Sequence, residues 1–172
     1  MILSDTQIAA LLEKGLIVNG YEGKDISPAS LDLHLGDELF VEGISDDCQW
    51  TLLPGFKSKS QDNPYFMDPN EFVLIATREV VQIPLSCAGE IKIRSSAARK
   101  GYTNALATWC DPGFRGAVTL ELKNYSRVAK LPLYPGLSVG QLILHRLETP
   151  SSKGYCGRYQ GDLGTSAAKE EI

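Results

Sequence analysis

Histidine is scarce in this 172-residue sequence, which contains only His34 and His145, far apart along the chain. Neither stands in an HExxH, HxE or PCxxC arrangement, the patterns that hold a catalytic zinc ion. We expect both side chains to lie on strand faces or to be partly buried. The sequence therefore argues against chemistry on a zinc-bound water, and P-loop and Rossmann glycine patterns are absent as well.

We also expect no disulfide framework, no signal peptide and no membrane-spanning segment. The four cysteines of the chain form no CxxC pair, so we expect reduced thiols rather than a disulfide framework. The N-terminus has no basic start or apolar centre of a signal peptide, and no apolar run approaches the roughly 20 residues that span a bilayer. The formal net charge of −4 argues against nucleic-acid polymers and membrane surfaces as partners. These absences predict a cytoplasmic protein.

One helix is predicted near the N-terminus, and almost everything after it is expected to form strands. Ser4 or Asp5 can cap the first turn, an apolar stripe begins at Ile8, and Gly15 ends the helix. Alternating or β-branched runs then occupy residues 30–36, 72–83, 88–93, 116–124 and 139–147. Pro and Gly turn signals separate them. Many short strands at short intervals predict a mainly β fold: a sandwich, a jelly roll or a distorted barrel.

No linker or internal repeat divides the chain, so we expect one β domain over residues 1–150. Residues 151–172 lose the apolar periodicity and are rich in Gly and Ser, a composition typical of disorder. They nevertheless retain Tyr155, Arg158 and Tyr159, which can order over a ligand. The composition alone favours disorder.

Three segments bring chemically useful side chains to the ends or faces of predicted strands. RSSAARKG, residues 94–101, places two guanidinium groups and two hydroxyls at a strand end, where the first N–H groups of a short helix would suit phosphate. Asp111 precedes a Pro-Gly turn that presents its carboxylate at a loop edge. Glu121 lies on the polar face of the strand at 116–124. Each segment also has a plain interpretation, a solvated turn or a solvent-facing carboxylate.

The order of these segments resembles the dCTP deaminase family, whose fold is shared with trimeric dUTPases. The resemblance covers nearly the full length and follows the family order. The matching stretches are MILSD at the start, ISPASLDLHLG at 26–36, RSSAARKG at 94–101, ATWCDPGFRGAVTLELKN at 107–124, LYPGLSVGQLIL at 133–144 and YCGRYQGDLG at 155–164. It implies a dUTPase-like distorted β-barrel or jelly roll with a short N-terminal helix, assembled as a homotrimer with active sites between subunits.

The resemblance also implies roles for individual residues. Glu121 matches the catalytic glutamate of the family's TLE motif, and Ser95 and Arg99 match residues near the reacting end of the base. Asp111 matches the aspartate that binds the deoxyribose 3′-hydroxyl, and the tail is expected to close over the nucleotide. The substrate-binding positions are Arg94, Ser96, Ala107, Asp111, Thr119, Gln141, Tyr155, Arg158 and Asp162.

The implied reaction is hydrolytic deamination of dCTP to dUTP and ammonia, with Glu121 rather than zinc relaying protons. Mg²⁺ would arrive on the triphosphate, so no protein metal site is expected. The same site can instead expel pyrophosphate from dUTP, with Asp111 helping to activate water. A dUTP diphosphatase, a bifunctional enzyme making dUMP from dCTP, and a catalytically silent nucleotide-binding regulator are therefore alternatives. Glu121 favours deamination, because a monofunctional dUTPase does not need it.

Two departures from the family pattern bear on regulation and substrate choice. The family's HxTA segment corresponds here to residues 104–107, Asn-Ala-Leu-Ala, with one residue fewer after Gly101. The replaced histidine and threonine belong to inhibition by dTTP in the family, so we do not expect that feedback. Asp162 stands where the family often has a phosphate-binding glutamine, and its charge beside a triphosphate is unfavourable unless Mg²⁺ intervenes.

Overall fold

The computed structural model describes residues 1–19, 21, 25–43, 50–105 and 107–169. Helical structure in these ranges is confined to α1 (Asp5–Leu12), α2 (Ser95–Ala98) and a 3₁₀ turn, η1 (Phe56–Ser58). In this part of the chain, no helix has the length and apolar character needed to cross a membrane.

Helix α1 lies where the sequence predicts it. The main-chain N–H of Ser4 donates to the Gln7 side chain at 3.1 Å, which satisfies one donor at the start of the helix. Ile8 is fully buried, so the apolar stripe faces the protein interior. Gly15 follows the helix with φ +86°, a left-handed conformation that glycine adopts without strain.

The other regular elements of the described residues are strands, and all of their pairings are antiparallel. The strands are β1 (Ile17–Asn19), β2 (Ile26–Ser27), β3 (Ser30–Glu42), β4 (Trp50–Leu52), β5 (Tyr65–Met67), β6 (Phe72–Gln82), β7 (Cys87–Ile93), β8 (Tyr102–Asn104), β9 (Trp109–Cys110), β10 (Arg115–Asn124), β11 (Leu131–Leu133) and β12 (Ser138–Arg146). The five long runs expected from the sequence are therefore confirmed as β3, β6, β7, β10 and β12.

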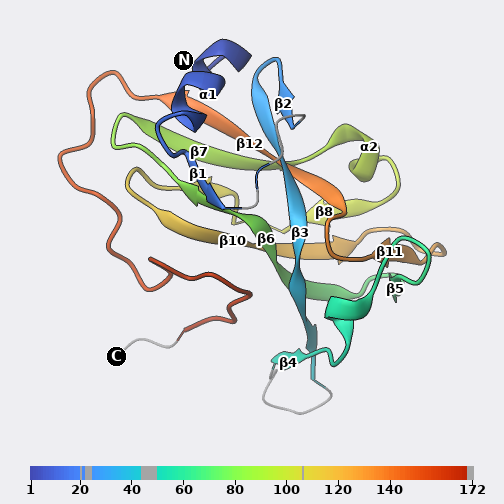
Figure 1. Cartoon of the computed structure of the whole chain (residues 1–172). Helices are drawn as coiled ribbons and strands as arrows, with labels where there is room; N and C mark the ends of the chain where they lie inside the picture. Colours follow the sequence, from blue (N-terminus) through green and yellow to red (C-terminus); the bar gives the residue numbers. More distant parts are fainter. Residues whose placement is uncertain (20, 22–24, 44–49, 106, 170–172) are drawn as a thin grey trace.

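Strand β3 joins the two halves of one curled sheet with the order β8-β10-β6-β3-β12-β7-β9. Its first part, residues 31–34, pairs with β12, and its later part, residues 35–41, pairs with β6. The register shifts between Leu35 and Leu39, and such an irregularity bends a strand. The sheet consequently curls into a distorted barrel (Figure 1), which confirms the predicted mainly β fold.

The core lies between the two halves of the curled sheet. Leu31, Leu33 and Leu35 alternate along β3 and are fully buried, as the period-two pattern predicts. Leu120 of β10 and Leu142 of β12 belong to the same apolar cluster. Consecutive side chains of a strand point to opposite faces, so the buried Leu120 and Leu142 determine which side chains of β10 and β12 face away from the core.

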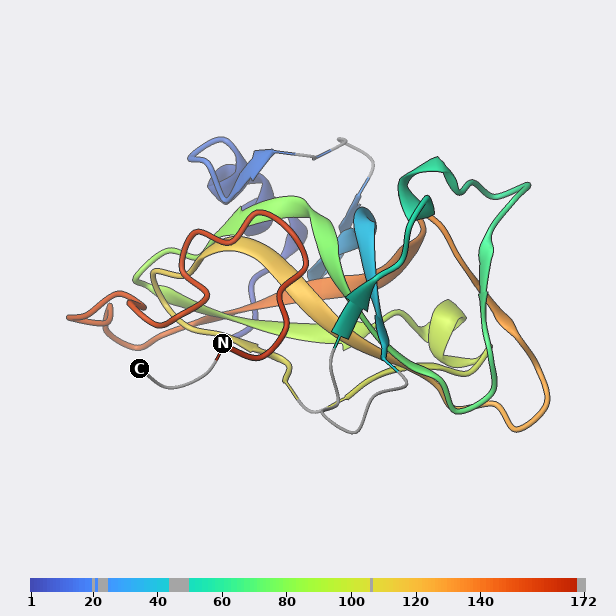
Figure 2. The same cartoon turned by 90° about the horizontal axis from the view of Figure 1, so that it is seen from below.

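The C-terminal segment packs against the sheet as far as residue 169, so the disorder that its composition suggests is not observed there. The N–H of Ala117 in β10 donates to the Asp162 carbonyl at 2.8 Å, and the Gly161 N–H donates to the Arg115 carbonyl at 2.7 Å. The Thr165 hydroxyl donates to the main chain of β3 and accepts from that of β6. Figure 2 shows this segment, in red, looping beside β10.

Candidate functional site

A cavity of about 550 Å³ lies where β9, β10 and the C-terminal segment meet. Its walls come from four stretches that are far apart in the sequence, near residue 50 and at 72–74, 107–121 and 155–168, and the fold brings them together. The residues of the predicted site that line it are Ala107, Asp111, Thr119, Glu121, Tyr155 and Asp162. This cavity is the candidate site.

Glu121 is held near the middle of β10. Its strand neighbours Leu120 and Leu122 are fully buried on the opposite face, so the carboxyl group is directed away from the core. The side chain is half-buried, and it makes no hydrogen bond or ion pair with any other described residue. A carboxyl group that is rigidly placed in a cavity and not committed to a protein partner is available for proton transfer.

Asp111 begins the turn that leads into β10. The indole N–H of Trp109 donates to its Oδ1 at 3.2 Å, which orients the carboxylate. Gly113 in the same turn has φ +83°, and a Cβ there would lie 2.6 Å from the Cα of Gly154. Only glycine therefore allows the C-terminal segment to approach this turn so closely.

Aromatic rings form much of the cavity wall. Trp50 and Phe72 pack edge to face with centroids 5.3 Å apart, and Phe114 and Tyr155 do so at 5.6 Å. Such flat, apolar surfaces suit the stacking of a nucleobase. Trp50, Phe72 and Phe114 were not predicted from the sequence, because no local pattern places them beside Glu121.

The C-terminal segment carries its own balance of charges. Lys169 Nζ lies 2.8 Å from both carboxylate oxygens of Asp162, and the Ser166 hydroxyl donates to the same carboxylate at 2.5 Å. Burial raises the pKa of Asp162, but the bonds from Lys169 and Ser166 outweigh it and lower the pKa overall. The unfavourable charge expected beside a phosphate is thus balanced within the segment.

Two further residues expected to bind substrate hold the C-terminal segment in place. Thr119 Oγ1 accepts from the Ser166 N–H at 3.2 Å, so it bonds the segment to β10. The Arg158 guanidinium donates to the Lys169 carbonyl at 2.6 Å, and Arg158 does not line the cavity. A role in phosphate binding would require the Arg158 guanidinium to reach into the cavity.

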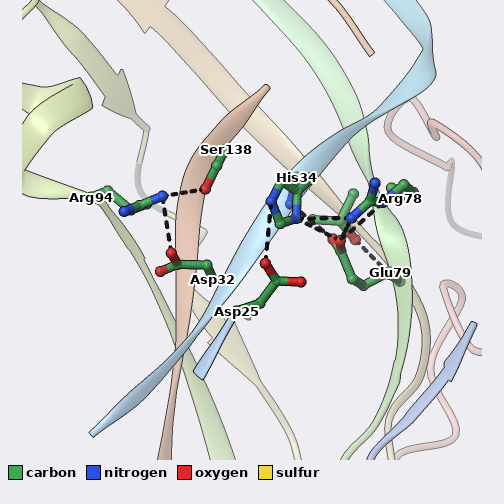
Figure 3. A network of polar contacts seen from close by, with 8 residues as sticks. Asp25, Asp32, His34, Arg78, Glu79, Arg94 and Ser138 are labelled. Atoms are coloured by element: carbon green, nitrogen blue, oxygen red, sulfur yellow. Dashed lines mark hydrogen bonds and ion pairs between the residues drawn. The ribbon is translucent and has the colours of Figure 1, made fainter. Parts of the chain in front are cut away.

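The Arg94–Arg99 block and Gln141 lie outside the cavity. Arg94 Nη1 contacts Asp32 at 2.9 Å and the Ser138 hydroxyl at 2.6 Å (Figure 3). Burial raises the pKa of Asp32, and the Arg94 guanidinium opposes that effect. Gln141 accepts from the Ser30 hydroxyl at 3.2 Å.

Ser95, Ser96 and Arg99 occupy α2 and its C-terminal end, and all three are exposed. Figures 1 and 2 place α2 and the C-terminal segment at opposite ends of the sheet. A single chain therefore assembles the residues around Glu121 and Asp111, and it presents the Arg94–Arg99 block on a different part of its surface.

A second polar network is buried beside the sheet (Figure 3). His34 donates its main-chain N–H to Glu79 Oε2 at 2.8 Å, and its Nδ1 lies 2.8 Å from Glu79 Oε1. Arg78 donates to the same carboxylate, and Asp25 lies 3.7 Å from His34 Nε2. His34 is only 8% exposed, so it is more deeply buried than the sequence suggests, and it does not line the candidate cavity.

One stretch of the chain matches the sequence pattern of a serine nucleophile elbow but does not have the structure of one. GLSVG at residues 136–140 matches the nucleophile-elbow pattern, but Ser138 begins strand β12 rather than a strand-to-helix turn. Its hydroxyl also accepts a hydrogen bond from Arg94. Within the described ranges, no three His, Cys, Asp or Glu side chains gather into a group that could hold a metal ion.

Comparison with known proteins agrees with this geometry. A model of the dCTP deaminase-like family matches residues 2–147. The "dCTP deaminase, dUMP-forming" of Persephonella marina is 32% identical over 98% of this chain and 97% of its own length. The protein of the same name from Acidothermus cellulolyticus is 37% identical over 98% and 95% of the two chains.

A solved structure shows the same fold. It is the 2′-deoxycytidine 5′-triphosphate deaminase of Agrobacterium tumefaciens, with a TM-score of 0.64 and 19% identity over 83% of this chain. The present chain spans about half of that protein, 48% of its length. The family match over residues 2–147, together with the near full-length likeness to two curated relatives, shows that this chain belongs to the dCTP deaminase-like family.

Proposed function

We propose that the protein hydrolyses dCTP to dUMP, with release of ammonia and pyrophosphate. The observation that carries the proposal is the cavity in which Glu121, Asp111 and a wall of aromatic rings meet. The sequence favours dUTP as the product and keeps dUMP as an alternative. We now favour dUMP, because the relatives at 32% and 37% identity are named for forming it.

In the first step, water adds to C4 of the cytosine ring. Glu121 takes a proton from the water and delivers it to N3, and a second proton passes to the amine at C4. The C4–N bond then breaks, ammonia leaves and the C4 carbonyl of uracil forms. The unpaired carboxyl group of Glu121 suits this relay, since each proton transfer needs an oxygen that is free to accept and release it.

In the second step, another water attacks the α-phosphorus of dUTP and pyrophosphate leaves. Asp111 is the carboxylate proposed to orient this water, while Trp109 holds its Oδ1. The whole reaction consumes one dCTP and two waters and yields dUMP, pyrophosphate and ammonia. Mg²⁺ enters as part of the substrate, and the oxygen donors of Asp111 and Asp162 in the cavity wall are of the type that this ion prefers.

A neighbouring copy of the chain is proposed to supply the cations for the triphosphate. The carboxylates of Asp111, Glu121 and Asp162 line the cavity, Lys169 balances the last of them, and no Lys or Arg is among the described lining residues. A triphosphate would be repelled by such a site unless positive charge were added. The exposed Arg99 and the half-buried Arg94 lie outside the cavity of their own chain, which supports a homotrimer with sites between subunits.

The test is to incubate the purified protein with dCTP and, separately, with dUTP, each with Mg²⁺ and with a chelator. Products are resolved by ion-exchange chromatography. CTP, which carries ribose in place of deoxyribose, is the control for selectivity toward the sugar. We expect dCTP and dUTP both to give dUMP in the presence of Mg²⁺. Accumulation of dUTP that is not consumed would instead establish a deaminase alone. Binding of both nucleotides without turnover would identify a silent regulator.

A further inference from the structure

The side chain of Asn104, at the end of β8, connects two walls of the candidate cavity. The main-chain N–H of Glu121 donates to Asn104 Oδ1 at 2.8 Å. Asn104 Nδ2 donates to the carbonyl of Ala107 at 3.3 Å. Glu121 and Ala107 line the cavity, whereas Asn104 does not. One amide group therefore sets the separation between β10 and the segment at Ala107.

The chemistry of the partners determines which way this amide points. A main-chain N–H can only donate a hydrogen bond, and a carbonyl oxygen can only accept one. Oδ1 must therefore face Glu121, and Nδ2 must face Ala107. Neither a hydrocarbon side chain nor a carboxylate can make both bonds, so an amide is required for the full bridge.

The position of Asn104 explains why a side chain is needed at this point. β8 ends at Asn104, which pairs with Leu122, while β10 continues past it. The carbonyl of Glu121 accepts a hydrogen bond from the Ala105 N–H at 2.8 Å. The N–H of Glu121, by contrast, donates to the Asn104 side chain. The amide thus replaces a main-chain acceptor where the chain leaves the sheet.

We infer that Asn104 is a positioning residue for deamination. It holds the backbone of Glu121 and the carbonyl of Ala107 in a fixed relation, so that the proton-relaying carboxyl group stays aligned with the reacting end of the base. Small displacements of a catalytic group cost large factors in rate, because the reacting atoms must lie within a narrow range of distances. The inference rests on the function proposed above and adds to it a residue that does not touch the substrate.

Asn124 offers a matched control on the same strand. It too bridges main-chain groups, since its Nδ2 donates to the carbonyls of Met67 and Ala129 and its Oδ1 accepts from the Ser126 N–H. It is fully buried and does not line the cavity. Loss of this amide is expected to reduce stability without favouring one reaction over the other.

The first experiment compares Asn104→Ala with wild type and with Asn124→Ala in two assays. For Asn104→Ala we expect kcat for consumption of dCTP to fall about tenfold, while its KM changes by no more than about twofold. Hydrolysis of added dUTP to dUMP should stay within about twofold, because that chemistry takes place at the α-phosphate. A purely structural asparagine would slow both reactions together, as Asn124→Ala is expected to do.

The Asn104→Asp variant separates the two hydrogen bonds. The introduced carboxylate still accepts from the Glu121 main-chain N–H, but it repels the Ala107 carbonyl. Protonation restores a donor to the same oxygen position, so deamination relative to wild type should rise as the pH falls from 7 to about 5. The same ratio for Asn104→Ala should not change with pH.

A readout that does not depend on turnover is the hydrogen exchange of the Glu121 amide. We expect Asn104→Ala to accelerate it about fivefold or more, and Asn104→Asp and Asn124→Ala to leave it near the wild-type rate. If wild type turns over neither dCTP nor dUTP, the proposed function is overturned. Suppose that wild type turns over dCTP and dUTP. If Asn104→Ala then slows the two reactions equally, or leaves the rate of deamination within twofold of wild type, only the inference on Asn104 is overturned.

Discussion

Lys169 Nζ lies 2.8 Å from each carboxylate oxygen of Asp162, so the C-terminal segment folds back on itself through an ion pair. Lys169 also donates to the Arg158 carbonyl and lies 5.3 Å from the centre of the Tyr159 ring. The main chain of Asp162 is in turn bonded to β10 through Ala117. This pair therefore connects the last described residues to the wall of the candidate cavity.

Removal of the Lys169 charge should loosen the segment. For Lys169→Met we expect the Ala117 amide, which donates to Asp162, to exchange about two- to fivefold faster, a factor that suits a partly exposed ion pair. Hydrogen exchange followed by NMR would measure it. Lys153→Met, at an exposed position of the same segment, is the control and should leave the Ala117 amide unchanged.

The same pair predicts a dependence on pH. The pKa of Asp162 is lowered in the folded protein. The ionised carboxylate therefore contributes fully to the packing of the C-terminal segment above the ordinary pKa of 3.8, and this contribution is lost as the pH falls through the lowered pKa. An NMR titration of the Ala117 amide should show the segment loosening below about pH 4. Asp162→Asn should abolish that step, and a step of unchanged size in this variant would show that another group is responsible.

Gly116 in β10 should control how closely the segment can approach. A Cβ at this position would lie 2.9 Å from the Asp162 carbonyl oxygen, so Gly116→Ala displaces the main chain of the segment. We expect kcat/KM for dCTP to fall about tenfold, because the cavity loses one wall. The control is Gly140→Ala in β12, where the nearest atom is a side-chain carbon at 3.6 Å, an ordinary contact. Equal losses in the two variants would count against a role for the docked segment.

The long strands were predictable from the sequence because each shows a local pattern of alternating or β-branched residues. Leu31, Leu33 and Leu35 alternate with polar residues, and that period alone specifies a strand with one buried face. The placement of Glu121 on the polar face of β10 follows by the same reasoning. Long strands of this kind needed no knowledge of the rest of the chain.

The walls of the cavity were not predictable in this way. Trp50 and Phe72 meet Glu121 only because β4 pairs with β3, and β3 and β10 both pair with β6. Asn104 shows no local pattern, since its two partners are a strand residue 17 positions away and a carbonyl beyond the end of β8. Such relations depend on strand pairing over long sequence separations, which a local pattern does not encode.

The buried carboxylate of Glu79 should be important for stability. It is 1% exposed and accepts from the His34 main chain, and its other oxygen contacts His34 Nδ1 and the Arg78 guanidinium. Glu79→Ala would leave these buried groups without their partner, and we expect a loss of about 3 kcal/mol in the free energy of unfolding. Chemical denaturation at one fixed protein concentration would measure it. Glu148→Ala, at an exposed site, should change it by no more than about 0.5 kcal/mol.

The proposed division of the site between two copies of the chain leads to the last prediction. Glu121 lines the cavity, whereas Arg99 is exposed outside it, and the Arg99 side chain has no hydrogen bond or ion pair among the described residues. We expect Glu121→Gln and Arg99→Met each to lower dCTP turnover about 100-fold. Neither should change the free energy of unfolding by more than about 0.5 kcal/mol, because neither side chain bonds to another described part of the fold.

Mixing the two variants decides whether Glu121 and Arg99 act across a subunit boundary. If the two variants are unfolded together in equal amounts and refolded, about a quarter of the sites in random homotrimers would combine an intact Glu121 from one copy with an intact Arg99 from its neighbour. Turnover should therefore recover to about a quarter of wild type. A site built within one chain could never regain both residues by exchange of subunits, so the mixture would stay as inactive as its components. Each variant refolded alone is the control, and recovery there would show that refolding itself, not subunit exchange, restores activity.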